Sequence, residues 1–325
     1  MPKEPLISVI VNVYDSVPNL KKCLDTLMLQ LYKNIEIICI DNSLSGMVTG
    51  VLYSYKSKDD RFKIVHTYKS NSSTAWNEGL RQAQGEYIHF INSNCWTLLD
   101  LYKVFADSVQ KSDFDIYMFN ASLYSEKFID VPFCDFFDDE NIKSVSENNL
   151  YTYKDINHII TNNLRVFNKI YRKTFLEDNK ISFYEQNNYS EYLFNIQTLV
   201  KSNTIYINPE VYVRSREQLI TEGSGTEFVF DIFNIIIELE RFLTSEDIFK
   251  YYAFDIFNFI CNALNSYYNY CPQELQEQYF NQMQTGLLNR FNSMPPNAQE
   301  IFKNIEEANF MLTSTYEEYQ SKKQS

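Results

Sequence analysis

Apolar residues gather in four short runs along the first part of the chain, and polar residues follow each run. The runs cover residues 6–14, 35–40, 62–66 and 87–91. Near-continuous apolar runs of this length, rich in Ile and Val, are typical of parallel strands that are covered on both faces. We therefore expect four buried strands.

Between these runs, the chain carries segments with the apolar spacing or the boundary signals of helices. The predicted helices cover residues 20–28, 47–55 and 74–84. A turn at residues 15–18 precedes the first one, with a capping residue and a proline that suit a helix start. Strands and helices alternate in β-α-β-α-β-α-β order, which predicts a doubly wound α/β layer with right-handed crossovers.

The pattern changes after Glu222. Apolar residues recur at helical spacing over residues 228–242 and 248–267, and Pro272, Pro295 and Pro296 interrupt the pattern. We expect two or three helices here and a polar tail from Thr315. These helices form either a cap on the first part of the chain or a face for a dimer or a partner protein. The predicted division is therefore residues 1–222 and 223–325.

The composition is that of an ordinary soluble globular protein. The 325 residues are 45% hydrophobic and 22% charged, and the formal net charge is −13. Because this charge would repel a phosphate backbone, we exclude a nucleic-acid partner. A membrane-spanning helix needs about 20 apolar residues, and no run approaches that length, so the only membrane association that we expect is peripheral.

The six cysteines show neither CxxC pairs nor metal-ligand spacing. They are Cys23, Cys39, Cys95, Cys134, Cys261 and Cys271. Reduced, buried thiols are expected in apolar periodic stretches, and they predict a cytoplasmic location. Of the scattered histidines His66, His89 and His158, His89 lies inside a predicted strand and is expected to be a core residue.

The fourth predicted strand ends in a polar cluster within the sequence GEYIHFINSNCW at residues 85–96. In open α/β sheets, ligands bind at the carboxyl ends of the strands. The stretch resembles the GEYIxFLDSDDW motif of bacterial family 2 glycosyltransferases, which have the GT-A fold. In that family the two aspartates of the DxD motif hold a metal ion on the diphosphate of the nucleotide-sugar. This chain has Asn92 and Asn94 in their place.

Further segments resemble the same family in the same order. SVIVNVYDS, NIEIICIDNS and TAWNEGLRQAQGEYI come first, and FNKIYRKTF, YSEYLFN and YINPEVYVRSREQLIT follow as a second block. Several weak motifs in one register are more specific than any one alone. The resemblance implies a GT-A fold with a mixed, mostly parallel sheet flanked by helices. It further implies a nucleotide-binding half at residues 1–115, an acceptor half at 116–222 and a helical extension at 223–325.

The resemblance places four residues at the nucleoside pocket. Asn12 and Tyr14 lie at the end of the first strand, and Asp41 and Asn42 match the aspartates of a DDGS motif. A carboxylate or amide oxygen there accepts a hydrogen bond from a uracil N–H. Two structural interpretations stay open: Tyr14 packs under a loop at the strand end, and Asp41 caps the following helix.

Other matched positions belong to the donor diphosphate. Trp76 stands where the family usually has arginine, and its neighbour Asn77 is retained. Because tryptophan cannot neutralise a phosphate, Arg214 and Arg216 of the last motif are expected to supply the missing positive charge.

The metal site that the resemblance implies is weakened in this chain. Neutral amide oxygens coordinate Mg²⁺ or Mn²⁺, but these hard cations prefer at least one or two carboxylates. We expect either a weak metal site at Asn92 and Asn94 or none. The neighbouring Cys95 adds little, since a thiol is a poor ligand for these metals.

Glu191 matches the aspartate that serves as catalytic base in inverting members of the family, and Ser190 replaces the glutamate before it. A carboxylate at this place removes the proton of the acceptor hydroxyl. The alternative is a solvated carboxylate in the first turn of a helix, which the helix dipole favours.

Three functions stay open. The first is a cytoplasmic, inverting glycosyltransferase, which moves a sugar from a nucleotide-sugar, expected to be UDP-linked, to a glycan or lipid-linked acceptor. The resemblance implies bacterial surface polysaccharide synthesis, of a capsule, lipooligosaccharide or O-antigen. The second is a non-catalytic GT-A module of a longer protein that binds a glycan, a nucleotide or a partner protein. The third is a different nucleotide-dependent activity built on the same cleft. For each function, the C-terminal helices are candidates for joining copies into a homo-oligomer.

Overall fold

The computed structural model describes residues 4–14, 17–43, 45–67, 71–124, 131–132, 148–156, 165–185, 187, 189–216, 228–294, 296–303 and 305–324. The chain divides into two compact units, Met1–Leu219 and Ile220–Ser325. Six features of the sequence analysis lie outside the described residues: positions 15–16 of the first turn, Cys134, His158, Pro295, positions 217–221 of the last motif and the division at residues 222–223.

Four parallel strands form one part of the sheet, as the apolar runs predict. They are β1 (Ile7–Val13), β2 (Ile35–Asp41), β3 (Phe62–His66) and β4 (Tyr87–Asn92), in the spatial order β3-β2-β1-β4. β1 pairs with β2 and β4, and its Asn12 lies in register with Ile40 and Asn92. The carboxyl ends of these strands therefore meet at one edge of the sheet.

The rest of the sheet has mixed direction. β9 (Lys169–Arg172) pairs antiparallel with both β4 and β6 (Ile116–Tyr124), and β10 (Ile205–Arg216) runs parallel to β6. The short strand β5 (Cys95–Thr97) pairs antiparallel with β10 and ends the sheet. Two further short strands, β7 (Val131–Pro132) and β8 (Leu150–Tyr151), pair with β6 and β10. This mixed α/β sheet is of the predicted class.

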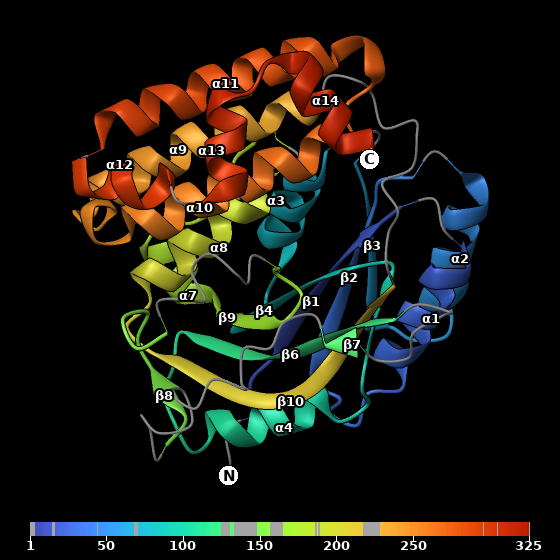
Figure 1. The fold of residues 1–325 in the computed structure, drawn as a ribbon. Coiled ribbons are helices and arrows are strands. Elements are labelled where there is room, and N and C mark those ends of the chain that lie inside the picture. Colours follow the sequence, from blue (N-terminus) through green and yellow to red (C-terminus); the bar gives the residue numbers. More distant parts are fainter. Residues whose placement is uncertain are drawn as a thin grey trace. The chain divides into compact units, whose positions relative to one another are not determined.

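Helices cover both faces of the sheet, because its central strands are apolar on both sides (Figure 1). One apolar cluster joins α1 (Val17–Met28), α2 (Gly46–Lys56) and α4 (Leu101–Val109) to Ile7, Val9, Val11 and Val13 of β1. The other joins α3 (Ser72–Gln82), α7 (Lys173–Asp178) and α8 (Ser190–Lys201) to Ile10. Side chains alternate along a strand, so Asn12 points to the same face of the sheet as Ile10, the face that α3 and α8 cover.

Two motif glycines permit close backbone packing. A Cβ at Gly79 would lie 2.2 Å from Cγ2 of Ile10, so only glycine lets α3 lie this close to β1. A Cβ at Gly85 would lie 2.6 Å from the backbone nitrogen of Ser8. The amide of Gly85 instead donates to Ser8 Oγ at 2.8 Å and to the Glu36 carboxylate at 3.1 Å. These glycines therefore maintain the scaffold.

His89 is a core residue, as predicted. Its ring is fully buried, and Nε2–H donates to the carbonyl of Phe167 at 2.9 Å. Because a carbonyl only accepts, Nδ1 is the acceptor of the Tyr102 hydroxyl at 2.8 Å. Burial lowers the pKa of His89 to about 4, so the ring is neutral near neutral pH. Cysteines 23, 39, 95, 261 and 271 are free and buried.

The second unit is helical in all its described elements. They are η1 (Phe228–Phe230), α9 (Asp231–Ser245), α10 (Phe249–Tyr268), η2 (Gln273–Leu275), α11 (Gln276–Ser293), α12 (Pro296–Lys303), α13 (Glu306–Thr313) and α14 (Tyr316–Gln324). The prediction of two or three helices was wrong. The polar tail from Thr315 forms α14, in which the ring of Tyr319 is buried.

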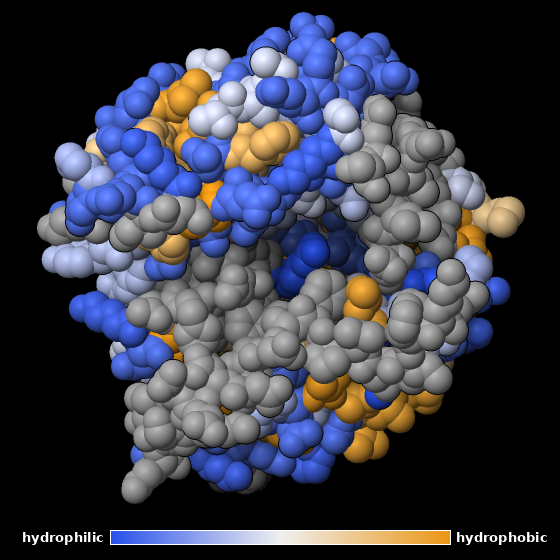
Figure 2. Space-filling model, in the orientation of Figure 1, coloured by the Kyte–Doolittle hydropathy of each residue, from blue (hydrophilic) through white to orange (hydrophobic). Residues whose placement is uncertain are grey.

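The surface of the second unit is mainly hydrophilic where it is visible in Figure 2, and hydrophobic residues are scattered over it. Among the described residues of both units, no helix is long and apolar enough to cross a membrane.

Candidate functional site

The candidate site lies at the carboxyl ends of β1 and β4, on the face that α3 and α8 cover. Asn12 Nδ2 donates to the Tyr14 hydroxyl at 2.8 Å, and this hydroxyl shares a 2.5 Å hydrogen bond with Ser72 at the start of α3. The backbone N–H of Tyr14 donates to Ser93 Oγ just beyond β4, at 3.3 Å. Tyr14 therefore links β1, α3 and β4, and burial raises its pKa to about 12, so the phenol stays protonated.

Glu191 lies in the first turn of α8, close to Tyr14. It is partly exposed, yet protein surrounds it on most sides, and this burial raises the pKa of its carboxyl. The guanidinium of Arg165, the indole N–H of Trp76 and the ammonium of Lys169 act against the rise. The charge of Glu191 in turn contributes to the raised pKa of Tyr14. A solvent-accessible carboxylate with a raised pKa is what a general base requires.

Hydrogen bonds from buried residues hold the helical turn that carries Glu191. Asn195 Nδ2 donates to the carbonyl of Glu191 at 2.8 Å, one helical turn further along α8. The hydroxyl of Tyr171, on β9, donates to Asn195 Oδ1 at 3.4 Å. Asn195 and Tyr171 are both fully buried. The position of Glu191 is therefore tied to the central sheet.

Trp76 and Asn77 support the site from the core. Trp76 is fully buried; its ring meets Phe90 edge-on and stacks on Phe183, with ring centroids 5.4 and 6.0 Å away. Its N–H lies near Glu191 without meeting the geometry of a full hydrogen bond. Asn77 Nδ2 donates to the carbonyl of Phe183 at 2.8 Å, and the N–H of Phe183 donates to Asn77 Oδ1 at 2.9 Å. Neither residue presents an open side chain to a donor.

The Asp41 carboxylate accepts hydrogen bonds from residues that follow its strand. One carboxylate oxygen accepts from Ser43 Oγ at 2.6 Å and from Ser43 N–H at 3.2 Å, and the other accepts from Thr49 Oγ1 of α2 at 2.7 Å. His66 Nδ1 of β3 lies 3.1 Å from the second oxygen. These contacts tie Asp41 to Thr49 of α2, but the N-cap of that helix is Ser45, so Asp41 does not cap it. Asn42 is half-buried beside it, and its amide oxygen lies 3.5 Å from the Thr67 hydroxyl.

Asn94 holds the end of β10 next to β5. Its Nδ2 donates to the carbonyl of Arg216 at 3.0 Å, and the N–H of Arg216 donates back to the Asn94 carbonyl at 3.0 Å. The guanidinium of Arg216 donates to Asn19 Oδ1 of α1 at 3.2 Å. Arg214 lies opposite Trp96 in the β10–β5 pairing. The structure thus brings Asn94, Arg214 and Arg216 together at one end of the sheet.

The donor groups around Asn92 and Asn94 do not fit a tightly held divalent cation. Both side chains are neutral amides, and Asn94 Oδ1 already lies 3.6 Å from the Cys95 sulfur. Burial raises the pKa of Cys95 to about 11, so it is a neutral thiol. No group of three or more His, Cys, Asp or Glu side chains in the described ranges could hold a metal ion. Mg²⁺ and Mn²⁺ prefer carboxylate oxygens, and neither Asn92 nor Asn94 supplies one.

Sequence reasoning missed two cationic residues of the site, Arg165 and Lys169. Lys169 opens β9 and is fully buried; its ammonium donates to the carbonyl of Arg165 at 2.6 Å and to Asn168 Oδ1 at 3.1 Å. Lys169 stands within the FNKIYRKTF segment, so the resemblance of that segment to the family was an available signal. Arg165 precedes that segment and carries no motif of its own.

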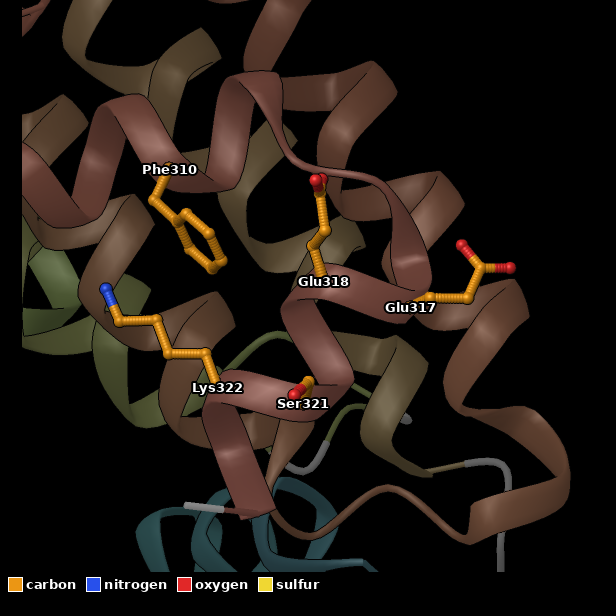
Figure 3. A pocket seen from close by; sticks show the side chains of 5 residues that line it. All are labelled: Phe310, Glu317, Glu318, Ser321 and Lys322. Atoms are coloured by element: carbon orange, nitrogen blue, oxygen red, sulfur yellow. The ribbon is translucent and has the colours of Figure 1, made fainter.

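A separate surface hollow lies on the second unit, where α13 and α14 meet (Figure 3). It is lined by Phe310, Glu317, Glu318, Ser321 and Lys322. The ammonium of Lys322 lies 4.4 Å from the centre of the Phe310 ring. This hollow is shallow, and its lysine contacts an aromatic ring. The hollow therefore lacks the convergent polar groups of a small-molecule site.

Comparison with known proteins adds sequence relatives for the first unit. The model of glycosyl transferase family 2 matches residues 8–178, more than half of the chain. The putative glycosyltransferase EpsH of Bacillus subtilis is 27% identical over 187 residues, which are 55% of this chain and 50% of that protein. The glycosyltransferase GlyG of Streptococcus pneumoniae is 30% identical over 122 residues, 37% of this chain and 40% of that protein. The chain thus matches half or less of the length of each.

Solved structures resemble the whole chain. TarS of S. aureus, residues 1–349 in complex with UDP-GlcNAc, has a TM-score of 0.67 at 17% identity, covering 98% of this chain and 92% of that one. The mannosyltransferase PcManGT of Pyrobaculum calidifontis, in complex with GDP-Man and Mn²⁺, has a TM-score of 0.50 at 12% identity, covering 98% and 84%. At these identities the likeness establishes the fold, and the predicted GT-A fold with a helical C-terminal region is confirmed.

Proposed function

The chain belongs to glycosyl transferase family 2, and we propose that it transfers a sugar from a nucleotide-sugar to an acceptor hydroxyl with inversion at the anomeric carbon. The observation that carries this proposal is the carboxylate of Glu191. It lies in the first turn of α8, near the carboxyl ends of β1 and β4, and burial raises its pKa. A carboxylate so placed is suited to accept a proton at the edge where α/β folds bind ligands.

The proposed reaction needs one base and one leaving group. Glu191 takes the proton of the acceptor hydroxyl, and the freed oxygen attacks the anomeric carbon of the donor sugar. The bond from that carbon to the diphosphate oxygen breaks, and the nucleoside diphosphate leaves with the electron pair. In this scheme, Tyr14 and Ser72 position the end of β1 and the start of α3 beside the reacting groups. Protonation of Glu191 stops the reaction, because a protonated carboxyl group cannot accept the proton of the acceptor hydroxyl.

The donor and acceptor classes follow from the family. We propose a UDP-linked donor, which the similarity to TarS supports, since that protein was crystallised with UDP-GlcNAc. Asn12, Tyr14, Asp41 and Asn42 lie at or next to the ends of β1 and β2, where the family binds the nucleoside. The acceptor in this proposal is a glycan or lipid-linked sugar of bacterial surface polysaccharide synthesis, reached from the cytoplasmic side of the membrane.

The test is the variant Glu191→Gln, which keeps the side-chain shape and removes the base. We expect transfer to fall by about 10²–10⁴-fold, the usual contribution of a general base. Nucleotide binding, measured by calorimetry with UDP, GDP, CDP and ADP, is expected to persist. Glu177→Gln on α7 is the matched control, because that carboxylate is largely exposed and pairs only with Lys173 on the same helix. A folded Glu191→Gln protein with full transfer would refute the base assignment.

A non-catalytic GT-A module is the second candidate. It is favoured by the two amides at the DxD positions and by the burial of Trp76 at the position of the family arginine. Such a module would bind a nucleotide, a glycan or a partner protein without turnover. A single confirmed transfer product from any nucleotide-sugar would exclude it.

A further inference from the structure

We propose that the donor diphosphate is bound without a metal ion, by the guanidinium of Arg165, and that the buried ammonium of Lys169 fixes the turn that presents it. The inference rests on the proposed function, because it assigns a cation to the same donor site. The ligand class is a nucleoside diphosphate or a nucleotide-sugar. Neither residue matches a donor-binding position of the family pattern.

Strand register places Arg165 at the correct edge of the sheet. β9 runs antiparallel to β4, with Arg172 opposite Tyr87, Tyr171 opposite Ile88 and Ile170 opposite His89. The start of β9 therefore lies toward the carboxyl end of β4, where Asn92 ends that strand. Residues 166–168 form the turn before β9, in which the Lys169 N–H donates to the Val166 carbonyl at 3.3 Å. This turn, with Arg165 before it, lies at the end of β9 that is nearer the carboxyl end of β4, where the DxD positions lie.

Hydrogen bonds hold this turn in place. Asn168 Nδ2 donates to the carbonyl of Phe119 on β6 at 3.2 Å, and the N–H of Phe119 donates to the Asn168 carbonyl at 3.1 Å. From the sheet side, the Lys169 ammonium donates to the carbonyl of Arg165 at 2.6 Å. A fully buried lysine is costly unless its charge is used or paired. Here it fixes the backbone of Arg165 and adds a second positive charge behind it.

The charges of this turn act on two groups of the site. Burial raises the pKa of the Glu191 carboxyl, and both Arg165 and Lys169 oppose that rise. Burial likewise raises the pKa of the Cys95 thiol, next to Asn94, and Arg165 again opposes it. One guanidinium therefore acts both on the proposed base and on the residue that follows the altered DxD positions. The diphosphate of a donor lies between these two places in the proposed reaction.

The chemistry of the leaving group makes a cation at this point necessary. A departing diphosphate gains negative charge, and a metal ion or fixed cations must stabilise it. Asn92 and Asn94 offer no carboxylate for a metal, and Trp76 offers no charge. Arginine binds phosphate oxygens through two parallel N–H groups and stays charged at all relevant pH values. Arg165 is an exposed residue.

The test is calorimetric titration of UDP, GDP, CDP and ADP into the full chain, each in EDTA and in Mn²⁺. The proteins are the wild type, Arg165→Met, Arg165→Lys and the control Arg81→Met. Arg81 is an exposed arginine of α3 that pairs with Glu78, so its removal changes the net charge equally. Thermal unfolding verifies that each variant is folded.

We expect one nucleoside diphosphate to bind the wild type with equal affinity in EDTA and Mn²⁺. Arg165→Met should weaken that binding by about 10- to 100-fold, as expected for the loss of a charge-assisted pair. Arg165→Lys should recover only part of the affinity, since lysine lacks the planar fork, and Arg81→Met should bind like the wild type. The matching nucleoside monophosphate should lose much less affinity in Arg165→Met.

Two results would overturn the inference and leave the proposed function standing: binding that requires Mn²⁺, or binding that Arg165→Met leaves unchanged. A wild-type protein that binds none of the four nucleotides under either condition would overturn both the inference and the proposed transfer activity.

Discussion

Glu191 is a carboxylate among groups that shift its pKa in opposite directions. Burial raises the pKa, and Arg165, Trp76 and Lys169 act against the rise, with a net upward shift. This balance fits a base that takes up a proton during the reaction. The sequence motif predicted the carboxylate of Glu191. Its neighbours Trp76, Arg165 and Lys169 lie in α3, before β9 and in β9, and only the fold brings these segments together.

The raised pKa of Glu191 predicts a shifted acid limb in the activity. The base works when deprotonated, and a raised pKa means that protonation begins at a higher pH as the pH falls. The rate kcat/KM should therefore decline on the acid side at a pH above 4.5, the ordinary value for a glutamate. A pH profile of kcat/KM tests this, and a limb at or below the ordinary value would contradict the proposed role.

Trp76→Phe should move the same limb to still higher pH. The change removes an N–H that favours the charged form of Glu191 while keeping an aromatic ring in contact with Phe90 and Phe183. We also expect a loss of about 1–3 kcal/mol in the free energy of unfolding, because the smaller ring leaves a cavity. Phe90→Leu is the control: it damages the same cluster without changing a polar group, so stability should fall with the limb unmoved. An acid limb of kcat/KM at the same pH in both variants would show that Trp76 has only a structural role.

Asn92→Asp tests whether the DxD positions lie at the diphosphate. A new carboxylate at the end of β4 should make nucleotide binding respond to Mn²⁺, since hard cations prefer such oxygens. Adding Asn94→Asp should strengthen the response but lower stability, because the amide that donates to the Arg216 carbonyl is lost. Calorimetry with Mn²⁺ and with EDTA measures both variants. Binding that ignores Mn²⁺ in each would place the two residues away from the diphosphate.

At the scale of elements, the site depends on how closely α3 packs on β1. Gly79 permits that approach, and Asn77 attaches α3 to the backbone of Phe183 through two hydrogen bonds. The segment TAWNEGLRQAQGEYI therefore positions the start of α3, where the Ser72 hydroxyl bonds that of Tyr14. In this chain the segment maintains the geometry of the site although the family's arginine is absent.

Gly79→Ala should destabilise the protein by about 1–3 kcal/mol, since the new methyl group would overlap Ile10 and force α3 away from β1. The matched control is Gly50→Ala in α2, where an added Cβ meets nothing within 4 Å. That change should stabilise by about 0.5–1 kcal/mol, because alanine favours the helix. Urea unfolding of the two variants compares them, and similar effects in both would argue against tight packing at Gly79.

The element pattern of the first four strands was predictable because a parallel strand covered on both faces must be apolar along its length. The sequence also predicted the family. It could not predict that Arg165 and Lys169 lie near Glu191, because this follows from β9 lying between β4 and β6. It also missed α14, whose helical surface is polar and in which Tyr319 is the fully buried aromatic residue.

At the scale of the whole molecule, the site residues and the two apolar clusters of the sheet all belong to the unit Met1–Leu219. A chain that ends after residue 219 should therefore unfold cooperatively by itself and bind the same nucleotide with unchanged affinity. Thermal unfolding and calorimetry measure these properties, with the full chain as the reference. If the helices of the second unit join copies into a homo-oligomer, the short chain should differ from the full one in mass by light scattering. Loss of cooperative unfolding would instead show that the helical unit is required for the fold of the first.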